Sequence, residues 1–200
     1  MRPITVAGFD AKFADNDDPW RTFDDPDEAL KRRAILHAVG AGPWGRVLEI
    51  AAGNGSNSAA MAPRARRLDA TEATEHGTQL VTKAVRPYQG RARAIRLAVP
   101  ARFPRPRYDI IVVAELLYYL SPRAMAHTAR DIAKSLRPSG TLVLAHHRID
   151  FPDFAQHAAD IQRRFLTATG RAWRVRRVRQ TGNWGVLSCR LQASPLQLSL

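Results

Sequence analysis

The chain has almost no cysteine and no long hydrophobic run. Cys189 is the only cysteine among the 200 residues, which excludes an intramolecular disulfide and a cysteine-cluster metal site. A run of about 18 apolar residues, the length of a transmembrane helix, does not occur. Residues 1–6 lack the apolar segment and cleavage site of a secretory signal. The sequence therefore predicts a cytoplasmic protein with no membrane partner.

Acidic residues and lysines are also scarce. The chain carries 18 acidic and 31 basic residues, a net charge of +13. The lysines are Lys12, Lys31, Lys83 and Lys134. Such a charge attracts anions, nucleic acid included. We favour the simpler interpretation that the arginines are spread over solvated faces and bind no particular partner. Clusters such as 174–179 alternate charged and apolar residues, as a half-buried strand does.

Strand and helix patterns alternate along the chain. Asp25-Pro26 is typical of a capped helix start, and helical spacing of apolar residues continues to Val39. Further helices are expected at about 56–63, after the Ser121-Pro122 cap, and near 154–168. Strands are expected at 46–50, 68–71, 94–98, 110–114, 141–145 after a turn at 138–140, and on either side of a turn at 181–183.

This order of elements predicts the fold class. With 45% hydrophobic residues in 200, one core and one domain over 1–200 are expected. We expect an α/β fold: a Rossmann-like, open, mostly parallel, seven-stranded sheet with helices on both faces and an antiparallel C-terminal hairpin. Its parts are an N-terminal cap segment and helix (1–42), a cofactor-binding core (43–148), and a C-terminal helix and hairpin (149–200).

Residues 47–55 are the most informative stretch. An apolar run passes through Glu49 into a small, glycine-rich turn that contains Gly53 and Gly55. Small residues let the backbone approach a ligand, and Glu72, 17 positions beyond Gly55, is in register to accept from ribose hydroxyls. Ala51 stands where a first glycine is expected. The spacing predicts a nucleoside-containing cofactor, although Glu72 could be a surface carboxylate instead.

Other polar residues follow the ends of the predicted strands, where parallel sheets bind ligands. Glu115 comes directly after an apolar run, so its carboxylate should face the cleft or hold a partner, such as a helix end or a cation. His146 and His147 could take a proton near neutral pH, with a structural role as an equal alternative. Tyr118 and Tyr119 could line the pocket or pack over the sheet edge. No metal is expected, because two adjacent histidines lack a third ligand at suitable spacing.

With these motifs the chain resembles class I S-adenosylmethionine-dependent methyltransferases. The pattern Glu49-x-Ala51-x-Gly53-x-Gly55 is similar to their glycine-rich motif, and Glu72 to their acidic ribose ligand. More specifically, the chain resembles the nodulation protein S-type methyltransferases over roughly residues 15–148. The segments that carry this likeness are 18–20, 48–50, 61–64 and, most distinctive, 108–120.

The resemblance implies methyl transfer from S-adenosylmethionine to an amine on a small molecule, such as an amino sugar or oligosaccharide. Glu115 and His146 are then the candidate bases, and Tyr119 orients the acceptor. The implied cofactor-binding residues are Trp20, Glu49, Ala51, Ala52, Gly53, Asn54, Gly55, Glu72, Ala73, Leu97, Ala98 and Glu115. No carboxylate lies in 97–100 to meet the adenine amino group, so backbone groups and apolar packing would hold the adenine.

Two other functions fit parts of the sequence. An RNA or rRNA methyltransferase would use the basic surface, but residues 114–117 replace the Asn/Asp-Pro-Pro-aromatic motif of many amino-methylating nucleic-acid enzymes. A non-catalytic binding module is the other alternative, suggested by Ala51 and the missing adenine acid. The sequence leaves the oligomeric state open.

Overall fold

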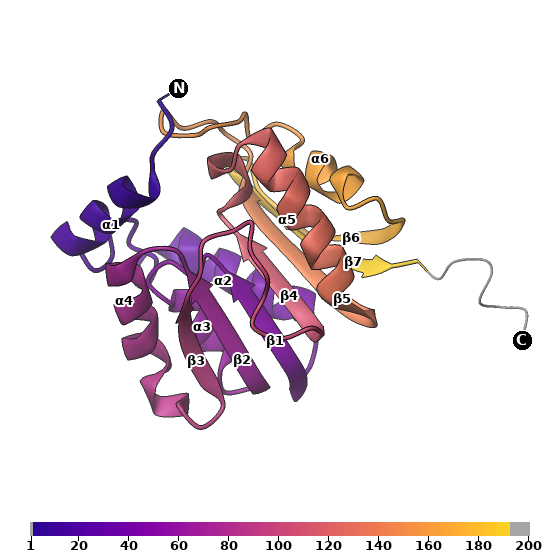
Figure 1. Cartoon of the computed structure of the whole chain (residues 1–200), viewed down its shortest axis with the longest axis horizontal. Coiled ribbons are helices and arrows are strands. Elements are labelled where there is room, and N and C mark those ends of the chain that lie inside the picture. Colours follow the sequence, from indigo (N-terminus) through magenta and orange to yellow (C-terminus); the bar gives the residue numbers. More distant parts are fainter. Residues whose placement is uncertain (1, 193–200) are drawn as a thin grey trace, which may run out of the picture.

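The computed structural model describes residues 2–192 of the chain. These residues form a seven-stranded sheet in the order β3-β2-β1-β4-β5-β7-β6 (Figure 1). The strands are β1 (Trp44–Ile50), β2 (Ala65–Glu72), β3 (Ala92–Arg96), β4 (Tyr108–Ala114), β5 (Leu136–His147), β6 (Trp173–Gln180) and β7 (Trp184–Leu191). Strands β1 to β5 pair in parallel, and β7 is antiparallel to both β5 and β6. The predicted fold class is confirmed.

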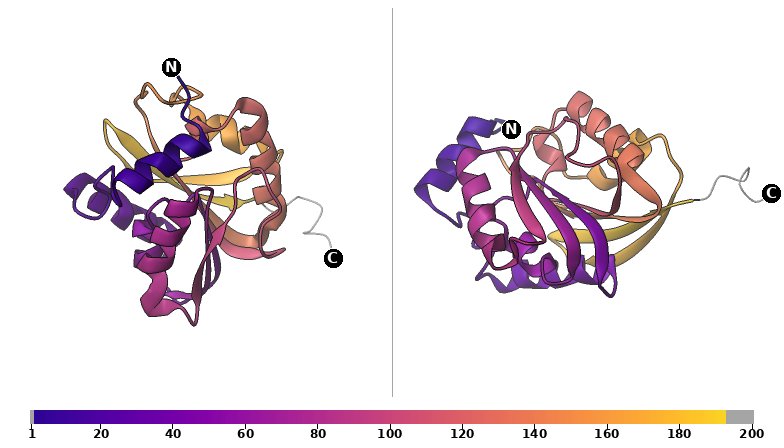
Figure 2. Two further views of the ribbon diagram at one scale, coloured as in Figure 1. Left: turned by 60° about the vertical axis from the view of Figure 1, so that its left-hand side comes forward. Right: turned by 60° about the horizontal axis from the view of Figure 1, so that its bottom comes forward.

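Helices cover both faces of the sheet (Figures 1 and 2). The α-helices are α1 (Val6–Asp15), α2 (Pro26–Val39), α3 (Ser56–Met61), α4 (Glu75–Val85), α5 (Pro122–Ser135) and α6 (Ile161–Ala168), with 3₁₀ turns η1 (Arg86–Tyr88) and η2 (Leu117–Tyr119). Helices α2, α3 and α4 share one core with the sheet, and α5 and α6 share the other. Within residues 2–192 we find no helix with the length and apolar character needed to cross a bilayer.

The central strands are buried on both faces, as their apolar sequences predict. In β4, Ile110 and Val112 pack in the α2–α4 core, whereas Ile111 and Val113 pack in the α5–α6 core. From β1 the chain runs outward to β3 and returns to β4 on the other side of β1. This reversal opens a crevice beyond the carboxyl ends of β1 and β4, where such sheets bind ligands.

Helix α1 was not predicted, and it reaches the same end of the sheet. The Thr5 side chain caps it by accepting from the Gly8 amide. Ahead of the helix, the amides of Arg2 and Ile4 donate to the carbonyls of Pro152 and Asp153 at 2.7 and 3.0 Å. These hydrogen bonds fix the N-terminal segment across the strand ends.

Several predicted segments have other bounds in the structure. The last helix begins at Ile161 rather than near 154, because Phe154 instead stacks on Tyr118 with ring centroids 3.7 Å apart. Strand β3 lies two residues earlier than predicted, in register with Leu68–Glu72 of β2. Residues 138–140 belong to β5 instead of a turn, and the β4–β5 register is irregular beside them.

Candidate active site

A cavity of about 710 Å³ opens where the strand order reverses. Its walls come from α1, the turn after β1, the ends of β2 and β4, the segment after β3, and the loop 151–153. A volume of this order suits a small ligand, for which roughly 300–1,000 Å³ is usual. Most of the predicted site residues line it: Trp20, Ala51, Ala52, Gly53, Asn54, Glu72, Ala73, Leu97, Ala98, Glu115 and Tyr119.

The two glycines of the turn after β1 leave space on different sides. Both have left-handed backbones, with φ of +61° at Gly53 and +86° at Gly55. A Cβ on Gly53 would meet only the edge of Phe13, 3.8 Å away, so this side opens to the cavity. A Cβ on Gly55 would lie 2.8 Å from the Ala84 Cβ and 3.0 Å from the Val81 Cα, so this side lets α4 pack. Gly53 therefore shapes the cradle for a ligand, and Gly55, which does not line the cavity, supports it.

Glu72 at the end of β2 fixes that turn. Its Oε2 accepts from the Gly53 amide at 2.9 Å, and its Oε1 accepts from the Thr74 amide and hydroxyl, both at 3.1 Å. Burial raises the pKa of the Glu72 carboxyl, although the hydrogen bonds from Thr74 and Gly53 lower it in part. Because each carboxylate oxygen has two acceptor sites, Oε2 of Glu72 keeps one site for a ligand hydroxyl. The arrangement fits a nucleoside cofactor.

Asn54 joins the turn to the loop before α2. Its Nδ2 donates to Asp18 Oδ1 at 2.8 Å, and its Oδ1 accepts from the Thr22 hydroxyl at 2.9 Å. Thr22 Oγ1 also lies 3.0 Å from Asp18 Oδ1, so its single hydroxyl hydrogen is shared between the two oxygens. This network of side chains holds the loop that carries Trp20 against the glycine turn. Trp20 in turn packs edge-on against Phe13, with ring centroids 5.4 Å apart.

Glu49 does not line the cavity. Its side chain is buried behind the turn and accepts a hydrogen bond from the Ser58 hydroxyl of α3. Burial raises the pKa of Glu49 to about 7, although the Ser58 hydrogen bond lowers it in part. The structure thus gives this predicted cofactor ligand a place beneath the cradle, where it ties β1 to α3.

The Glu115 carboxylate faces the cavity and also forms an ion pair and hydrogen bonds. Both roles were predicted from its position in the sequence. Its backbone is left-handed, with φ of +52°. Oε1 lies 2.7 Å from Nζ of Lys31, and Oε2 accepts from the Tyr118 hydroxyl and, at 3.3 Å, from the His147 amide. Its side chain keeps 29% exposure. The carboxylate is held rigidly and remains open to a ligand.

Lys31 of α2 lines the cavity and was missed by the sequence reasoning. Its side chain is 4% exposed, and Nζ lies 2.7 Å from both Glu28 Oε1 and Glu115 Oε1. Burial lowers its pKa, but the Glu115 and Glu28 charges outweigh that effect and raise the pKa overall. A signal was present, because Lys31 shares the apolar stripe of α2 with Ala34, Ile35 and Ala38.

The two adjacent histidines point to opposite faces of β5, and the structure brings His147 to the cavity rather than His146. His146 is 1% exposed, its Nε2 accepts from the Leu117 amide at 3.3 Å, and burial lowers its pKa to about 3. His147 Nε2 lies 3.7 Å from Glu115 Oε2, with Nδ1 3.3 Å from the Asn183 carbonyl oxygen. The geometry does not favour His146 as the base and makes His147 the better candidate.

Tyr119 stands at the outer part of the cavity among aromatic side chains. Its ring packs edge-on against Phe9 at 4.8 Å and against Phe154 at 5.1 Å. Burial raises the pKa of the Tyr119 hydroxyl, so the group is a neutral hydrogen-bond donor. The side of the cavity beyond β3 is apolar, formed by Leu97, Ala98 and Val99. It offers packing and backbone groups to a flat ring.

Comparison with known proteins identifies the class. The model of the Methyltransferase domain family matches residues 21–187. The chain belongs to this family.

Individual relatives include nodulation protein S-type methyltransferases. Over 135 residues the chain is 29% identical to nodulation protein S of Rhizobium tropici, a match that spans 66% of this chain and 56% of that protein. The solved N-methyltransferase NodS from Bradyrhizobium japonicum WM9, in complex with S-adenosyl-L-homocysteine, has the same fold, with a TM-score of 0.79 and 22% identity over 94% of this chain and 98% of that one. The DhpI-SAM-HEP complex gives a TM-score of 0.70 at 17% identity, covering 92% and 95%. The predicted resemblance to nodulation protein S-type methyltransferases is confirmed.

Proposed function

We propose that the chain transfers a methyl group from S-adenosylmethionine to an amine on a small molecule such as an amino sugar or oligosaccharide. The observation that carries this proposal is the hydrogen bond between the Gly53 amide and Glu72. The turn and this carboxylate form a cradle, which is open to the cavity on the side where a Cβ on Gly53 would lie. It lies in the same cavity as the rigid Glu115 carboxylate. The family and the methyltransferase neighbours support the same reaction class.

Different parts of the cavity would hold different parts of the cofactor. Glu72 would accept from a ribose hydroxyl, the backbone of the turn Ala51–Asn54 would lie close to the ligand, and Leu97–Val99 would pack against the adenine. When bound, S-adenosylmethionine supplies an electrophilic methyl group on a positively charged sulfur. The nearby carboxylates of Glu72 and Glu115 favour a cation in this cavity.

The acceptor amine approaches from the outer, aromatic half of the cavity. It must arrive with a free lone pair, which forms the new N–C bond as the S–C bond breaks. Glu115 accepts an N–H hydrogen bond and orients the amine, because Lys31, Tyr118 and His147 already hold the carboxylate. Tyr119 contacts the rest of the acceptor. His147, the cavity-facing imidazole beside Glu115, takes the proton that the product amine releases.

Labelled methyl transfer tests the proposal. The chain is incubated with methyl-labelled S-adenosylmethionine and either glucosamine oligomers or their N-acetylated forms, which lack the free amine. We expect label on the free amines only, and loss of most turnover in Tyr119→Phe and His147→Ala. Label on RNA and on none of the amines would replace this proposal with the RNA methyltransferase alternative. Cofactor binding without transfer to any acceptor would favour a binding module.

A further inference from the structure

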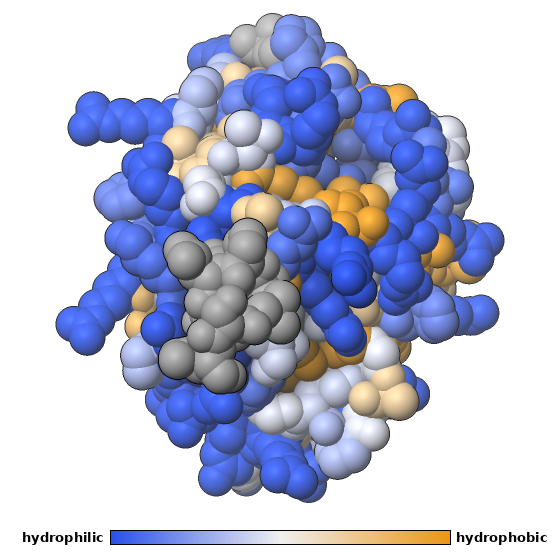
Figure 3. Space-filling model, turned by 90° about the vertical axis from the view of Figure 1, so that its right-hand side faces the viewer, coloured by the Kyte–Doolittle hydropathy of each residue, from blue (hydrophilic) through white to orange (hydrophobic). Residues whose placement is uncertain are grey.

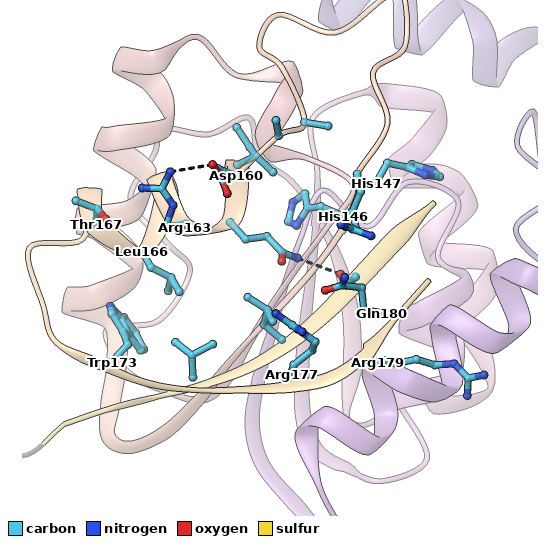
Figure 4. Close-up of a pocket in the computed structure, with 18 of the residues that line it drawn as sticks. His146, His147, Asp160, Arg163, Leu166, Thr167, Trp173, Arg177, Arg179 and Gln180 are labelled. Carbon is cyan, nitrogen blue, oxygen red and sulfur yellow. Dashed lines mark hydrogen bonds and ion pairs between the residues drawn. The ribbon is translucent and has the colours of Figure 1, made fainter. Parts of the chain in front are cut away.

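A second cavity, of about 770 Å³, lies between α6 and the β6–β7 hairpin (Figure 4). It occupies the face of the sheet that α5 and α6 cover. His146 lines this second cavity but not the first, whereas His147 lines both. The two cavities therefore adjoin across the end of β5. The proposed methyl transfer makes no use of the second one.

Positive charge dominates its walls. The arginines that line it are Arg148, Arg163, Arg171, Arg177 and Arg179. The lining carboxylate, Asp160, is paired with Arg163 at 2.9 Å. Within residues 2–192, Arg171, Arg177 and Arg179 have no ion pair and no hydrogen bond from their guanidinium groups. Arg177 stands opposite Leu187 on the α6 face of the hairpin, whereas Arg179 stands opposite Val186 and points away from the cavity (Figure 4). Arg171 and Arg177 are therefore the cations available to an anion in the cavity.

A buried donor at the end of β5 adds to this arrangement. Because Nε2 of His146 accepts from the Leu117 amide, the single proton of the neutral ring must be on Nδ1. That Nδ1 is buried and has no hydrogen-bond partner within residues 2–192. An unsatisfied buried N–H is costly, and Figure 4 shows His146 at the end of the cavity between α6 and the hairpin. An anionic oxygen or a water that it orders would satisfy this donor.

The start of α6 presents further donors. Asp160 precedes the helix with φ of +56°, and no side chain caps the first turn. Asp160, Ile161, Gln162 and Arg163 of this turn all line the cavity. The Ile161 amide donates to the Ala158 carbonyl at 3.1 Å, and the other amides of this helix start, together with the helix dipole, favour negative charge. Three kinds of donor thus converge on one space.

The floor of the cavity is apolar. Trp173 and Val175 of β6 alternate with outward arginines, and Leu166 of α6 and Leu187 of β7 complete the floor. Val175 is 46% exposed. Figure 3 shows this side of the molecule, where hydrophilic side chains surround a narrower hydrophobic strip. The cavity therefore suits a ligand with both an anionic and an apolar part.

We propose that this cavity is a second ligand site, which binds a small molecule carrying a phosphate or diphosphate group beside an apolar or aromatic part. Guanidinium groups match phosphate oxygens in pairs and are the preferred cations for them. The volume suits a small molecule. Arg177 holds the phosphate, and the floor at Trp173 and Val175 takes the apolar part.

Titration calorimetry with inorganic pyrophosphate tests the anion site, at about 150 mM salt to screen long-range attraction. The variant Arg177→Gln should bind pyrophosphate at least ~10-fold more weakly, the loss expected when charge-assisted hydrogen bonds from its guanidinium are removed. The matched control is Arg176→Gln, which removes the same charge from the other face of β6, outside the cavity. It should change the affinity less than about 2-fold, since only screened attraction is lost. S-adenosylhomocysteine affinity should stay unchanged in both variants, which separates this test from the proposed function.

Phenyl phosphate and inorganic phosphate test the apolar floor. We expect phenyl phosphate to bind more tightly, because its ring reaches Trp173 and Val175. Equal affinity for the two would overturn the apolar part of the proposal. No pyrophosphate binding at millimolar concentration, equal losses in Arg177→Gln and Arg176→Gln, or binding of single-stranded RNA without pyrophosphate would overturn the anion site itself.

Discussion

The amide of Gly53 donates a hydrogen bond to Oε2 of Glu72 at 2.9 Å, which joins the turn after β1 to the end of β2. The bond spans 19 positions of the chain and brings the two parts of the nucleotide motif into one unit. The same carboxylate also accepts from Thr74, so it is fixed in place before any ligand binds and keeps one acceptor site on Oε2. The cradle is therefore preformed, which reduces the ordering cost of binding.

The first prediction concerns Glu72→Gln. The amide NH₂ of glutamine would face one of the donors that Glu72 now accepts from, and the charge that favours ribose hydroxyls would be lost. We expect S-adenosylhomocysteine to bind roughly 10- to 100-fold more weakly, about 1.5–3 kcal/mol for a hydrogen bond to a charged group. Glu75→Gln, three residues later and 52% exposed, is the control and should bind as the wild type does. Equal affinities in wild type and Glu72→Gln would refute the role.

The two glycines of the turn should respond differently to alanine. In Gly55→Ala the new methyl group meets α4, with the Val81 Cα at 3.0 Å, so the fold loses stability by roughly 2–4 kcal/mol from overpacking and left-handed strain. In Gly53→Ala without a ligand the new methyl group has room, so only the left-handed backbone is unfavourable and the stability falls by about 1 kcal/mol. It should nevertheless weaken cofactor binding strongly. Urea unfolding and calorimetry measure the two effects, and the reverse pattern would contradict the assignment.

Replacing Ala51 by glycine should strengthen cofactor binding, whereas replacing Gly53 by alanine weakens it. Its φ of +56° is left-handed, a conformation that costs an L-residue about 1–2 kcal/mol. Ala51→Gly removes that strain but adds backbone entropy to the unfolded chain, about 0.5–1 kcal/mol. We expect unchanged or slightly increased stability in urea and tighter binding of S-adenosylhomocysteine. Weaker binding in Ala51→Gly would show that the methyl group contributes to the cradle.

Glu49 makes stability depend on pH. Its pKa is raised from 4.5 to about 7, so between these values the folded chain holds a proton that the unfolded chain has released. The free energy of unfolding then falls as pH rises through this window, by up to about 3 kcal/mol. Glu49→Gln, which can still accept from Ser58, should lack this fall.

Comparison of the two proteins by urea unfolding at pH 5, 6 and 7 isolates the contribution of Glu49. His146 acts with the opposite sign, because its pKa is lowered to about 3 and its contribution to stability rises with pH up to 6.5. That contribution is common to wild type and variant and cancels in the difference. A constant difference between the two proteins from pH 5 to 7 would contradict the prediction.

Lys31 should hold Glu115 in place. Lys31→Met leaves two carboxylates without their buried cation, and because Glu28 and Glu115 are 24% and 29% exposed we expect a loss of about 2–3 kcal/mol, below that of a fully buried pair. Adding Glu115→Gln to Lys31→Met should recover part of the loss in urea unfolding. Recovery in the double variant tests the pairing, and additive losses would contradict it.

Local patterns of the sequence were sufficient to predict most of the sheet and the turn that joins Gly53 to Glu72, because the apolar run 110–114 and the spacing of these two residues act over a short range. The places of Gly55 and Glu49 were not predicted, because packing against α4 and a hydrogen bond from Ser58 of α3 put them outside the cavity. Long-range packing decided the rest. His146 and His147 are adjacent, and only the register of β5 against β4 and β7 determines which one faces the cavity. Likewise, the segment before α1 is fixed across the strand ends by hydrogen bonds from Arg2 and Ile4 to residues 152 and 153, which no local pattern reveals.

The most direct test of this account is titration of S-adenosylhomocysteine into the wild-type chain and into Glu72→Gln. We predict binding to one site in the wild type and a dissociation constant roughly 10- to 100-fold higher in the variant. Absence of binding to the wild-type chain at millimolar ligand would contradict the central claim that the Gly53–Glu72 cradle holds the methyl donor.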